Sequence, residues 1–333
     1  MQRLVCDHGF VRCSATGILD VMNRLFRDVS GPSLAPDGSV VCIGAFDGMH
    51  LGHRAVLARV RERAAARKLV SVVVSFEPLP REFFAHARKV PRLSSAREKI
   101  GQFVEEKLDR ALLLRFNATL SAMPAQEFVE RVLVARLNVK EVWVGEGFRF
   151  GHARGGDLAL LARMGEAHGF SANALEPVVL EGERISSSTI REALAGGSFE
   201  LAARWLGRPF TIGGHVVRGQ QLGRKLGYPT ANLRLGRRTS PVDGIFAVRV
   251  LGVGPKPLPG VASLGVRPTV NGKEPLLEAH LFDFDGDLYG KRIEVEFVSK
   301  LRDEEKFADL DAMVKQIDRD AAQARSILLA SHN

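Results

Sequence analysis

Short apolar runs alternate with helical patterns between about residue 39 and residue 195. Four runs rich in valine, leucine and isoleucine predict strands, at Ser39–Ile43 and at residues 70–75, 111–114 and 142–144. The runs are continuously apolar, which favours strands that are buried on both faces.

Helical patterns occupy the intervals between these strands. One helix is predicted over Leu51–Arg67 and another over about residues 124–137. Ser95 and Glu98 have the spacing of a capping box, which predicts a further helix that runs to about Leu108. Because buried strands that alternate with helices are typical of a parallel sheet covered on both faces, we expect an α/β domain.

The pattern changes near Gly207. Glycine-rich turns follow, and apolar residues recur with a period of two, for example along residues 246–250. Closely spaced strands joined by such turns predict an antiparallel barrel. An amphipathic helix with Phe307 on its apolar face is expected from about Asp303 onward.

These patterns divide the chain into four parts. Residues 1–38 form an N-terminal extension. Residues 1–21 are expected outside the fold, because the segment that begins at Met22 resembles the N-terminus of a protein. Residues 39–197 form the first domain, residues 198–207 a linking helix, and residues 208–333 the second domain.

Length and composition fit this two-domain organisation. The chain has 333 residues, against roughly 150 for a typical domain. Hydrophobic residues make up 45% of the chain and charged residues 26%, which excludes a disordered or fibrous protein. No apolar run approaches the roughly 20 residues that a membrane-spanning helix needs, which excludes an integral membrane protein.

Charge and cysteine content further limit the ligands and the cellular location that the sequence predicts. The formal net charge is +9, and the basic residues are spread along the chain, which favours anionic ligands such as nucleotides over nucleic acid. Cys6, Cys13 and Cys42 form neither a disulfide framework nor a paired metal-binding motif. The reducing cytoplasm is therefore the expected location.

A glycine-rich segment with two histidines follows the first strand and precedes the first helix. Its glycines allow the backbone to turn and to approach a ligand closely. His50 and His53 can face one side of the first helical turn, where ring donors and helix-end N–H groups together suit a triphosphate. A turn with incidental histidines and a weaker zinc-binding pair stay open as alternatives. The other candidate nucleotide-binding residues of the segment are Gly44, Phe46, Asp47 and Gly48.

A second polar segment, late in the first domain, contains Ser187, Ser188 and Arg191. Thr189 and Glu192 have capping-box spacing, which predicts that a helix begins here. Exposed N–H groups at a helix start bind phosphate, and the Arg191 guanidinium can fork onto phosphate oxygens. Simple N-capping without a ligand is the alternative.

These two segments resemble the His-x-Gly-His and Ser-Ser-Thr-x-x-Arg signatures of the α/β nucleotidyltransferases, with Ser188 where threonine is usual. The resemblance implies that His50 and His53 contact the phosphates of a nucleoside triphosphate. It further implies that a substrate phosphate attacks the α-phosphorus and that no covalent enzyme intermediate forms.

A strand, a glycine-rich basic loop and a polar turn follow one another at the start of the second domain. Backbone amides at Gly219 and Gly223 can face phosphates, and Arg224 and Lys225 add positive charge. An ordinary hairpin with a solvated basic loop is the alternative.

Oxygen-bearing side chains mark the polar turn and a later strand. Thr230 and Asn232 offer ligands of the hard kind that Mg²⁺ prefers. Glu278 lies in a strand-like run, where a carboxylate could take the proton from an attacking hydroxyl group. A solvated strand glutamate is the alternative for Glu278.

Further segments resemble the FAD synthetase family, the bifunctional bacterial riboflavin kinase/FMN adenylyltransferases. The similar segments are residues 75–80, 145–151, 229–232, 243–250, 263–269, 277–284, 287–291 and 301–307. Three positions depart from the family pattern: Leu79 replaces a common histidine, Gly147 an acidic or amide residue, and Ser263 a common asparagine. The similarity covers about residues 39–330, and the order of the domains matches.

The resemblance implies an α/β Rossmann-like nucleotidyltransferase domain followed by a mainly antiparallel, riboflavin kinase-like β-barrel with a C-terminal helix. It implies ATP-dependent phosphorylation of riboflavin to FMN, then adenylylation of FMN to FAD with release of pyrophosphate. By the same resemblance, Thr230 and Asn232 hold Mg-ATP, and Glu278 is the base. Flavin-binding residues are expected at Phe148, Phe150, Arg302 and Phe307.

The expected ligands follow from the same resemblance. They are Mg²⁺, ATP as a substrate, riboflavin, FMN and FAD, and no tightly bound redox cofactor is required. Neither nucleic acid nor membrane is expected as a partner, and a homo-oligomer stays open. A riboflavin kinase with a weakened or lost adenylyltransferase half is the alternative that Gly147 and Leu79 raise. A nucleic-acid or regulatory binder is less favoured, because basic residues do not cluster with aromatic ones.

Overall fold

The computed structural model describes residues 24–85, 90–219, 223, 227–235, 239–269 and 272–330. The predicted extension at residues 1–21 lies outside the described residues, as do Arg224 and Lys225. The described chain forms two compact units. The first unit consists of the residues up to Ala45, Val56–Pro78 and Phe103–Leu175, and the second of Phe46–Ala55, Leu79–Gln102 and the residues from Glu176 onward. The contiguous domain limits expected from the sequence stay a prediction.

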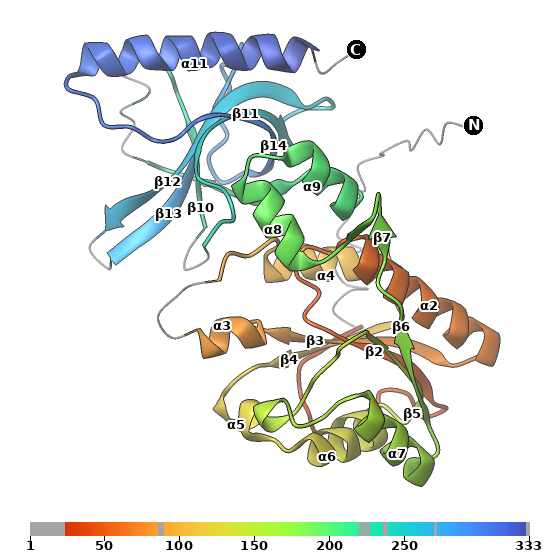
Figure 1. The fold of residues 1–333 in the computed structure, drawn as a ribbon. Helices are drawn as coiled ribbons and strands as arrows, with labels where there is room; N and C mark the ends of the chain where they lie inside the picture. Colours follow the sequence, from red (N-terminus) through yellow and green to blue (C-terminus); the bar gives the residue numbers. More distant parts are fainter. Residues whose placement is uncertain are drawn as a thin grey trace, which may run out of the picture. The chain divides into compact units, whose positions relative to one another are not determined.

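A six-stranded parallel sheet forms the centre of the first unit (Figure 1). Its strand order is β1-β4-β3-β2-β5-β6, and every neighbouring pair runs parallel. The strands are β1 (Leu25–Phe26), β2 (Ser39–Ile43), β3 (Val70–Glu77), β4 (Arg110–Arg115), β5 (Val139–Gly145) and β6 (Ser171–Leu175). The predicted parallel α/β fold is confirmed, and β1 adds an edge strand from within residues 1–38.

Helices cover both faces of this sheet (Figure 1). Helix α2 (Leu51–Arg67) lies on one side, and α5 (Ala118–Ala122), α6 (Ala125–Phe128), the π-helix η1 (Val129–Arg136) and α7 (Leu158–His168) lie on the other. A short 3-10 turn, η2 (His152–Arg154), precedes α7. Alternate strand residues such as Val72 and Val74 pack with Leu133 and Leu161 in one core. The helix predicted over residues 124–137 is α6 continued by η1.

Short elements precede the barrel of the second unit. They are α3 (Pro80–Phe84), α4 (Ala96–Glu105, whose last residues belong to the first unit), the hairpin of β7 (Val179–Leu180) and β8 (Glu183–Arg184), α8 (Ser187–Ala195) and α9 (Phe199–Leu206). The predicted capping box of α4 is confirmed, because the Ser95 N–H donates to Glu98 Oε2 at 2.6 Å and the Glu98 N–H donates to Ser95 Oγ at 3.2 Å.

The predicted cap of α8 is wrong. Ser186 caps this helix, and the Thr189 N–H donates to Ser186 Oγ at 3.2 Å. Thr189 is therefore already inside the first helical turn, where its hydroxyl group faces back to the cap and interacts with the Ser186 N–H. The helix consequently begins at Ser187, which places both Ser187 and Ser188 in its first turn.

A closed six-stranded barrel forms most of the second unit, with the strand order β10-β13-β12-β11-β14-β9. All neighbouring strands run antiparallel, which confirms the predicted antiparallel barrel. The strands are β9 (Thr211–Val217), β10 (Ala231–Arg234), β11 (Gly244–Leu251), β12 (Leu258–Thr269), β13 (Gly272–Leu281) and β14 (Arg292–Arg302). Phe246, Leu277 and Val295 are buried in its core together with Trp205 of α9.

Helix α11 (Leu310–Ala330) packs outside the barrel, where Ala324 and Leu328 contact the cluster around Val261 (Figure 1). The prediction that this helix starts at about Asp303 is wrong. Asp309 caps the helix, since its Oδ1 accepts the Ala312 N–H at 2.7 Å. Phe307 therefore precedes the helix. In the part of the chain that the structure describes, no helix combines the length and apolar character needed to cross a membrane.

Candidate functional site

The histidine loop, residues 44–53, connects β2 to the first turn of α2. Its start is fixed by the Gly44 N–H, which donates to the Val74 carbonyl at 3.0 Å. Phe46, Gly48 and Met49 adopt positive φ angles of 49°, 87° and 44°. A Cβ atom at Gly48 would lie 2.8 Å from Leu93, so this position requires glycine for both its backbone angle and its close packing.

The rings of His50 and His53 stack, with their centroids 3.6 Å apart. The backbone N–H of His53 donates to His50 Nδ1 at 3.3 Å, so the proton of neutral His50 sits on Nε2. Nδ1 of His53 is buried and has no hydrogen-bond partner among the described residues.

Both imidazoles are neutral at pH 7. Burial, and secondarily the charge of Arg191, lowers the pKa of His50 to about 4. Burial holds the pKa of His53 well below its usual value, with smaller contributions from His50 and Lys99. The pair can therefore donate hydrogen bonds to a phosphate without carrying charge of its own.

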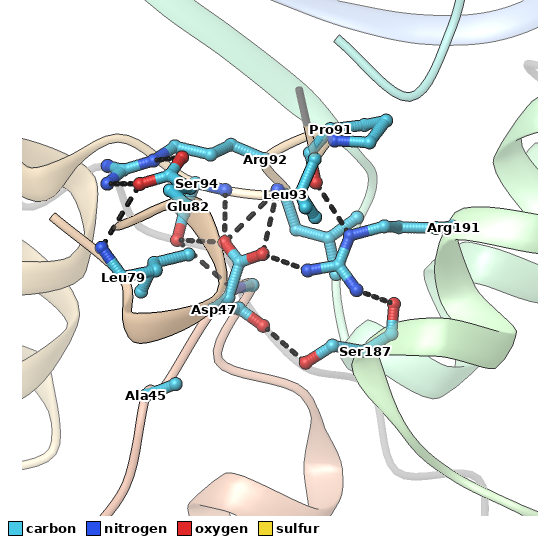
Figure 2. A network of polar contacts seen from close by, with 12 residues as sticks. Ala45, Asp47, Leu79, Glu82, Pro91, Arg92, Leu93, Ser94, Ser187 and Arg191 are labelled. Carbon is cyan, nitrogen blue, oxygen red and sulfur yellow. Dashed lines mark hydrogen bonds and ion pairs between the residues drawn. The ribbon is translucent and has the colours of Figure 1, made fainter. Parts of the chain in front are cut away.

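Asp47 fastens the histidine loop to two neighbouring segments (Figure 2). Its carboxylate accepts the N–H groups of Leu93 and Ser94, each at 3.1 Å, and forms an ion pair with Arg191. Its backbone carbonyl accepts the Ser187 hydroxyl group at 3.0 Å. Since the residue is only 2% exposed, Asp47 acts on the shape of the loop from inside the protein.

Arg191 donates from all three of its guanidinium nitrogens (Figure 2). Nε binds the Pro91 carbonyl at 2.6 Å, Nη1 binds the Ser187 carbonyl at 2.9 Å, and Nη2 binds Asp47. Burial lowers the pKa of Arg191, and the Asp47 carboxylate opposes that shift. The predicted phosphate contact of Arg191 stays a prediction, while its contacts within the protein hold α8, the Pro91 segment and the histidine loop together.

The N-terminus of α8 faces the same network. Ser187 is half-buried against Asp47, and Ser188 is exposed in the first turn. Unpaired N–H groups at such a helix start favour an anion. The structure thus brings Asp47, Ser187 and Arg191 together, while their predicted nucleotide contacts stay a prediction.

The aromatic pair expected to bind flavin lies in the first unit. Phe148 and Phe150 stack with ring centroids 5.5 Å apart, and Phe150 is buried in the core beside Phe128. Gly147 has a φ of 72° and no neighbouring atom within 4 Å of where a Cβ would stand. Glycine therefore suits position 147 because of its left-handed backbone conformation. The surrounding space would accommodate a larger side chain.

Thr230 and Asn232 meet at the start of β10. Asn232 Nδ2 donates to the Thr230 carbonyl at 3.2 Å and to Thr230 Oγ1 at 3.4 Å. Asn232 is 5% exposed, and its Oδ1 accepts no hydrogen bond from the described residues. A Cβ at Gly219 would stand 2.7 Å from that oxygen, so glycine lets the segment after β9 approach it.

Strand register places Glu278 beside Asn232. The two residues are direct partners across β10 and β13, and Glu278 also pairs with Ser263 on β12. Their neighbours Leu233 and Leu277 point into the barrel core, so Asn232 and Glu278 share the outer face. Predicted metal ligands and predicted base are thus adjacent.

The same outer row continues to Arg302. Ser263 pairs with Ile245, and Ile245 pairs with Arg302 on β14. Arg302 donates from Nε and Nη2 to Asp320 of α11 at 3.0 and 2.8 Å. Its guanidinium also lies over the Phe307 ring, 5.7 Å from the centroid. The two expected flavin-binding residues of the barrel therefore contact each other.

Glu304 was not predicted, yet it borders this row. Ser263 Oγ donates to Glu304 Oε1 at 3.3 Å. A Cβ at Gly265 would overlap the Glu304 carboxylate, so glycine leaves room for this contact. The serine in place of the family asparagine is thus a donor to Glu304. Ser263 and Glu304 come together through the pairing of strands, and their spacing in the sequence does not predict the contact.

Gly223 lies close to the polar turn, and the Tyr228 N–H donates to its carbonyl at 2.8 Å. The phosphate role predicted for Gly219, Gly223, Arg224 and Lys225 stays a prediction. No group of three or more metal-binding His, Cys, Asp or Glu side chains occurs within the described ranges.

Both halves of the chain are similar to known proteins. The FAD synthetase family matches residues 33–189, and the riboflavin kinase family matches residues 206–328. The bifunctional riboflavin kinase/FMN adenylyltransferase of Escherichia coli strain K12 is 46% identical over 303 residues, which is 91% of this chain and 97% of that protein. Its Pseudomonas fluorescens counterpart is 48% identical over 295 residues, 88% of this chain and 94% of that protein.

Structural comparison extends the likeness to the fold. A crystal structure described as a macrolide-efflux protein from Streptococcus pneumoniae matches with a TM-score of 0.73 and 30% identity, over 89% of this chain and 96% of that one. The two family matches follow each other in the expected order, and the identity to bifunctional relatives extends over nine-tenths of the sequence. Together they assign the family of this chain. The chain belongs to the bifunctional riboflavin kinase/FMN adenylyltransferase family.

Proposed function

We propose that this chain makes FAD from riboflavin in two ATP-dependent steps, phosphorylation to FMN and then adenylylation to FAD. The observation that carries the proposal is the presence of two distinct site geometries in one family member. One is the histidine loop with α8, and the other is the outer row of the barrel with Asn232 and Glu278.

The first geometry supports nucleotidyl transfer. An FMN phosphate oxygen attacks the α-phosphorus of ATP, the bond from that phosphorus to the bridging oxygen breaks, and pyrophosphate leaves. No strong base is needed, because the attacking phosphate is already ionised. We assign to His50 and His53 the donation of hydrogen bonds to the phosphates, together with the N–H groups that Ser187 and Ser188 contribute at the start of α8.

The second geometry supports phosphoryl transfer to an alcohol. The riboflavin 5′-hydroxyl attacks the γ-phosphorus of ATP, ADP leaves, and Glu278 accepts the hydroxyl proton. The residues present fit Mg²⁺, since the buried Asn232 Oδ1, which has no hydrogen-bond partner among the described residues, stands beside the Thr230 hydroxyl. When bound there, the ion neutralises negative charge on the nucleotide phosphates.

Flavin contacts are assigned to both halves. Arg302 and Phe307 border the outer row of the barrel, and Phe148 and Phe150 lie in the first unit. We also propose a cytoplasmic location and no nucleic-acid or membrane partner, as the sequence predicts. A homo-oligomer is compatible with this proposal.

Incubation of the purified protein with riboflavin, ATP and magnesium tests the proposal, with the flavins separated by chromatography. FMN followed by FAD is the expected result. Accumulation of FMN without FAD would support the riboflavin kinase with a lost adenylyltransferase half. Steeply salt-dependent RNA binding without ATP turnover would support a nucleic-acid binder instead.

A further inference from the structure

The histidine loop contacts residues that precede the barrel strands. These residues and the loop from Phe46 onward belong to the second unit, which contains Phe46–Ala55 as well as everything from Glu176 onward. Arg208 lies between α9 and β9, inside the range matched by the riboflavin kinase family. Its side chain nevertheless reaches the loop that carries the adenylyltransferase histidines.

Arg208 binds the backbone of that loop directly. Its Nη2 donates to the Gly48 carbonyl at 3.1 Å. Its Nε lies 3.2 Å from the amide oxygen of Gln102 on α4, with the amide oriented to accept. The half-buried guanidinium therefore bridges the histidine loop and α4, and the charged donor strengthens both hydrogen bonds.

Gly48 is held from both sides of its backbone. Its N–H donates to Ser94 Oγ at 3.0 Å, and its carbonyl accepts from Arg208. Gly48 stands two residues before His50, in a stretch where Phe46, Gly48 and Met49 all have positive φ angles. Such a backbone persists only where surrounding contacts over-determine it.

Two neighbouring contacts make the same connection. A Cβ at Gly207 would stand 2.7 Å from Leu51, the residue after His50, so the backbone before Arg208 packs closely against the start of α2. The Gly213 N–H of β9 donates to Glu98 Oε1 at 3.0 Å. Glu98 thereby serves both the capping box of α4 and the first barrel strand.

We propose that Arg208 is a positioning residue for the adenylyltransferase reaction, although it belongs to the kinase half of the sequence. It holds the Gly48 peptide so that the His50 and His53 rings keep their orientation toward the phosphates. The inference rests on the proposed function, and it makes FMN adenylylation dependent on a residue that the phosphorylation of riboflavin does not need.

The test compares Arg208→Met with the unaltered full-length chain. Adenylylation of supplied FMN and phosphorylation of riboflavin are measured in the same preparation. We expect kcat for FAD formation to fall about tenfold, which corresponds to about 1.4 kcal/mol in the barrier. The KM for ATP should change less than twofold, and the kinase kcat should stay within twofold.

Two further variants separate positioning from a general structural role. Arg208→Lys keeps a donor for the Gly48 carbonyl and should recover part of the lost kcat. Arg204→Met removes another nearby arginine, whose guanidinium pairs with exposed Glu181 at 2.7 Å, and should leave both activities unchanged.

The outcomes distinguish this inference from the proposed function. If the unaltered chain forms no FAD, the proposed function fails. If it forms FAD and Arg208→Met adenylylates FMN equally fast, or loses both activities together, the positioning role is overturned.

Discussion

At the scale of single residues, Asp47 and Arg191 show that residues of two separate signatures can bind each other within the protein. The sequence predicts both as nucleotide-binding, because they stand in two phosphate-binding signatures. The Asp47 carboxylate accepts five hydrogen bonds from Leu93, Ser94 and Arg191, and each guanidinium nitrogen of Arg191 donates to a protein oxygen. Their pairing joins segments that are more than 140 residues apart, which no local spacing predicts.

Asp47→Asn keeps the size of this side chain and removes its charge. The change leaves the Arg191 guanidinium buried without its carboxylate, which costs roughly 3–5 kcal/mol for pairs of this kind. We expect the free energy of unfolding in urea to fall by about that amount. Glu181→Gln breaks the exposed pair with Arg204 and should cost less than about 1 kcal/mol. Equal losses in the two variants would contradict a buried structural pair.

His50 links folding stability to pH. Its folded pKa is about 4, below the ordinary 6.5, so the fold favours the neutral ring. The resulting stabilisation is complete above about pH 6.5 and is lost as the pH falls from there toward 4. The shift corresponds to about 3 kcal/mol. Unfolding free energies measured between pH 4 and pH 7 should fall less steeply for His50→Asn than for the unaltered chain. Parallel slopes would show that this ring titrates normally.

At the scale of elements, strand type was predictable and strand register was not. Apolar periodicity placed β2 and α2 at their observed bounds, and it indicated the antiparallel strands beyond Gly207. Register depends on pairing across the barrel, which sets Asn232 beside Glu278 and Glu278 beside Ser263. The early start predicted for α11 has a similar cause, because Phe307 fits the apolar period of the helix but packs with Arg302 ahead of it.

Gly265→Ala tests the contact that borders this row. A Cβ at position 265 would overlap the Glu304 carboxylate, which must then leave Ser263 Oγ. We expect kcat/KM for riboflavin phosphorylation to fall about threefold to tenfold, since an exposed hydrogen bond of this kind is worth roughly 0.5–1.5 kcal/mol. Adenylylation of supplied FMN should not change.

Gly254→Ala provides the matched control. This glycine is exposed, and no atom lies within 4 Å of where its Cβ would stand. Its kinase rate should equal that of the unaltered chain. A kinase loss of the same size in both variants would show that the segment of residues 263–265 has no particular role at the site.

At the scale of the whole molecule, the division into an α/β part and a barrel followed from periodicity, and the function followed from motifs. What could not be anticipated is how the chain partitions. The histidine loop from Phe46 onward and α8 belong to the same compact unit as the barrel, while the parallel sheet, Phe148 and Phe150 belong to the other. Sequence order alone places the loop with its sheet, because it directly follows β2.

Two separate sites predict that the two activities can be lost one at a time. Glu278→Gln removes the proposed base and should lower FMN formation about 100-fold or more. Adenylylation of supplied FMN should continue at the original rate. His53→Ala removes a buried ring that stacks on His50, and it should have the converse effect.

Each variant carries its own folding control, since the surviving activity is measured in the same sample. Addition of EDTA should stop riboflavin phosphorylation in the unaltered chain, if the adjacent side chains of Thr230 and Asn232 hold Mg²⁺ as proposed. Activity that persists without the metal would remove it from the kinase step. Loss of both reactions in a variant that stays folded would contradict the two separate sites that the different surroundings of His53 and Glu278 indicate.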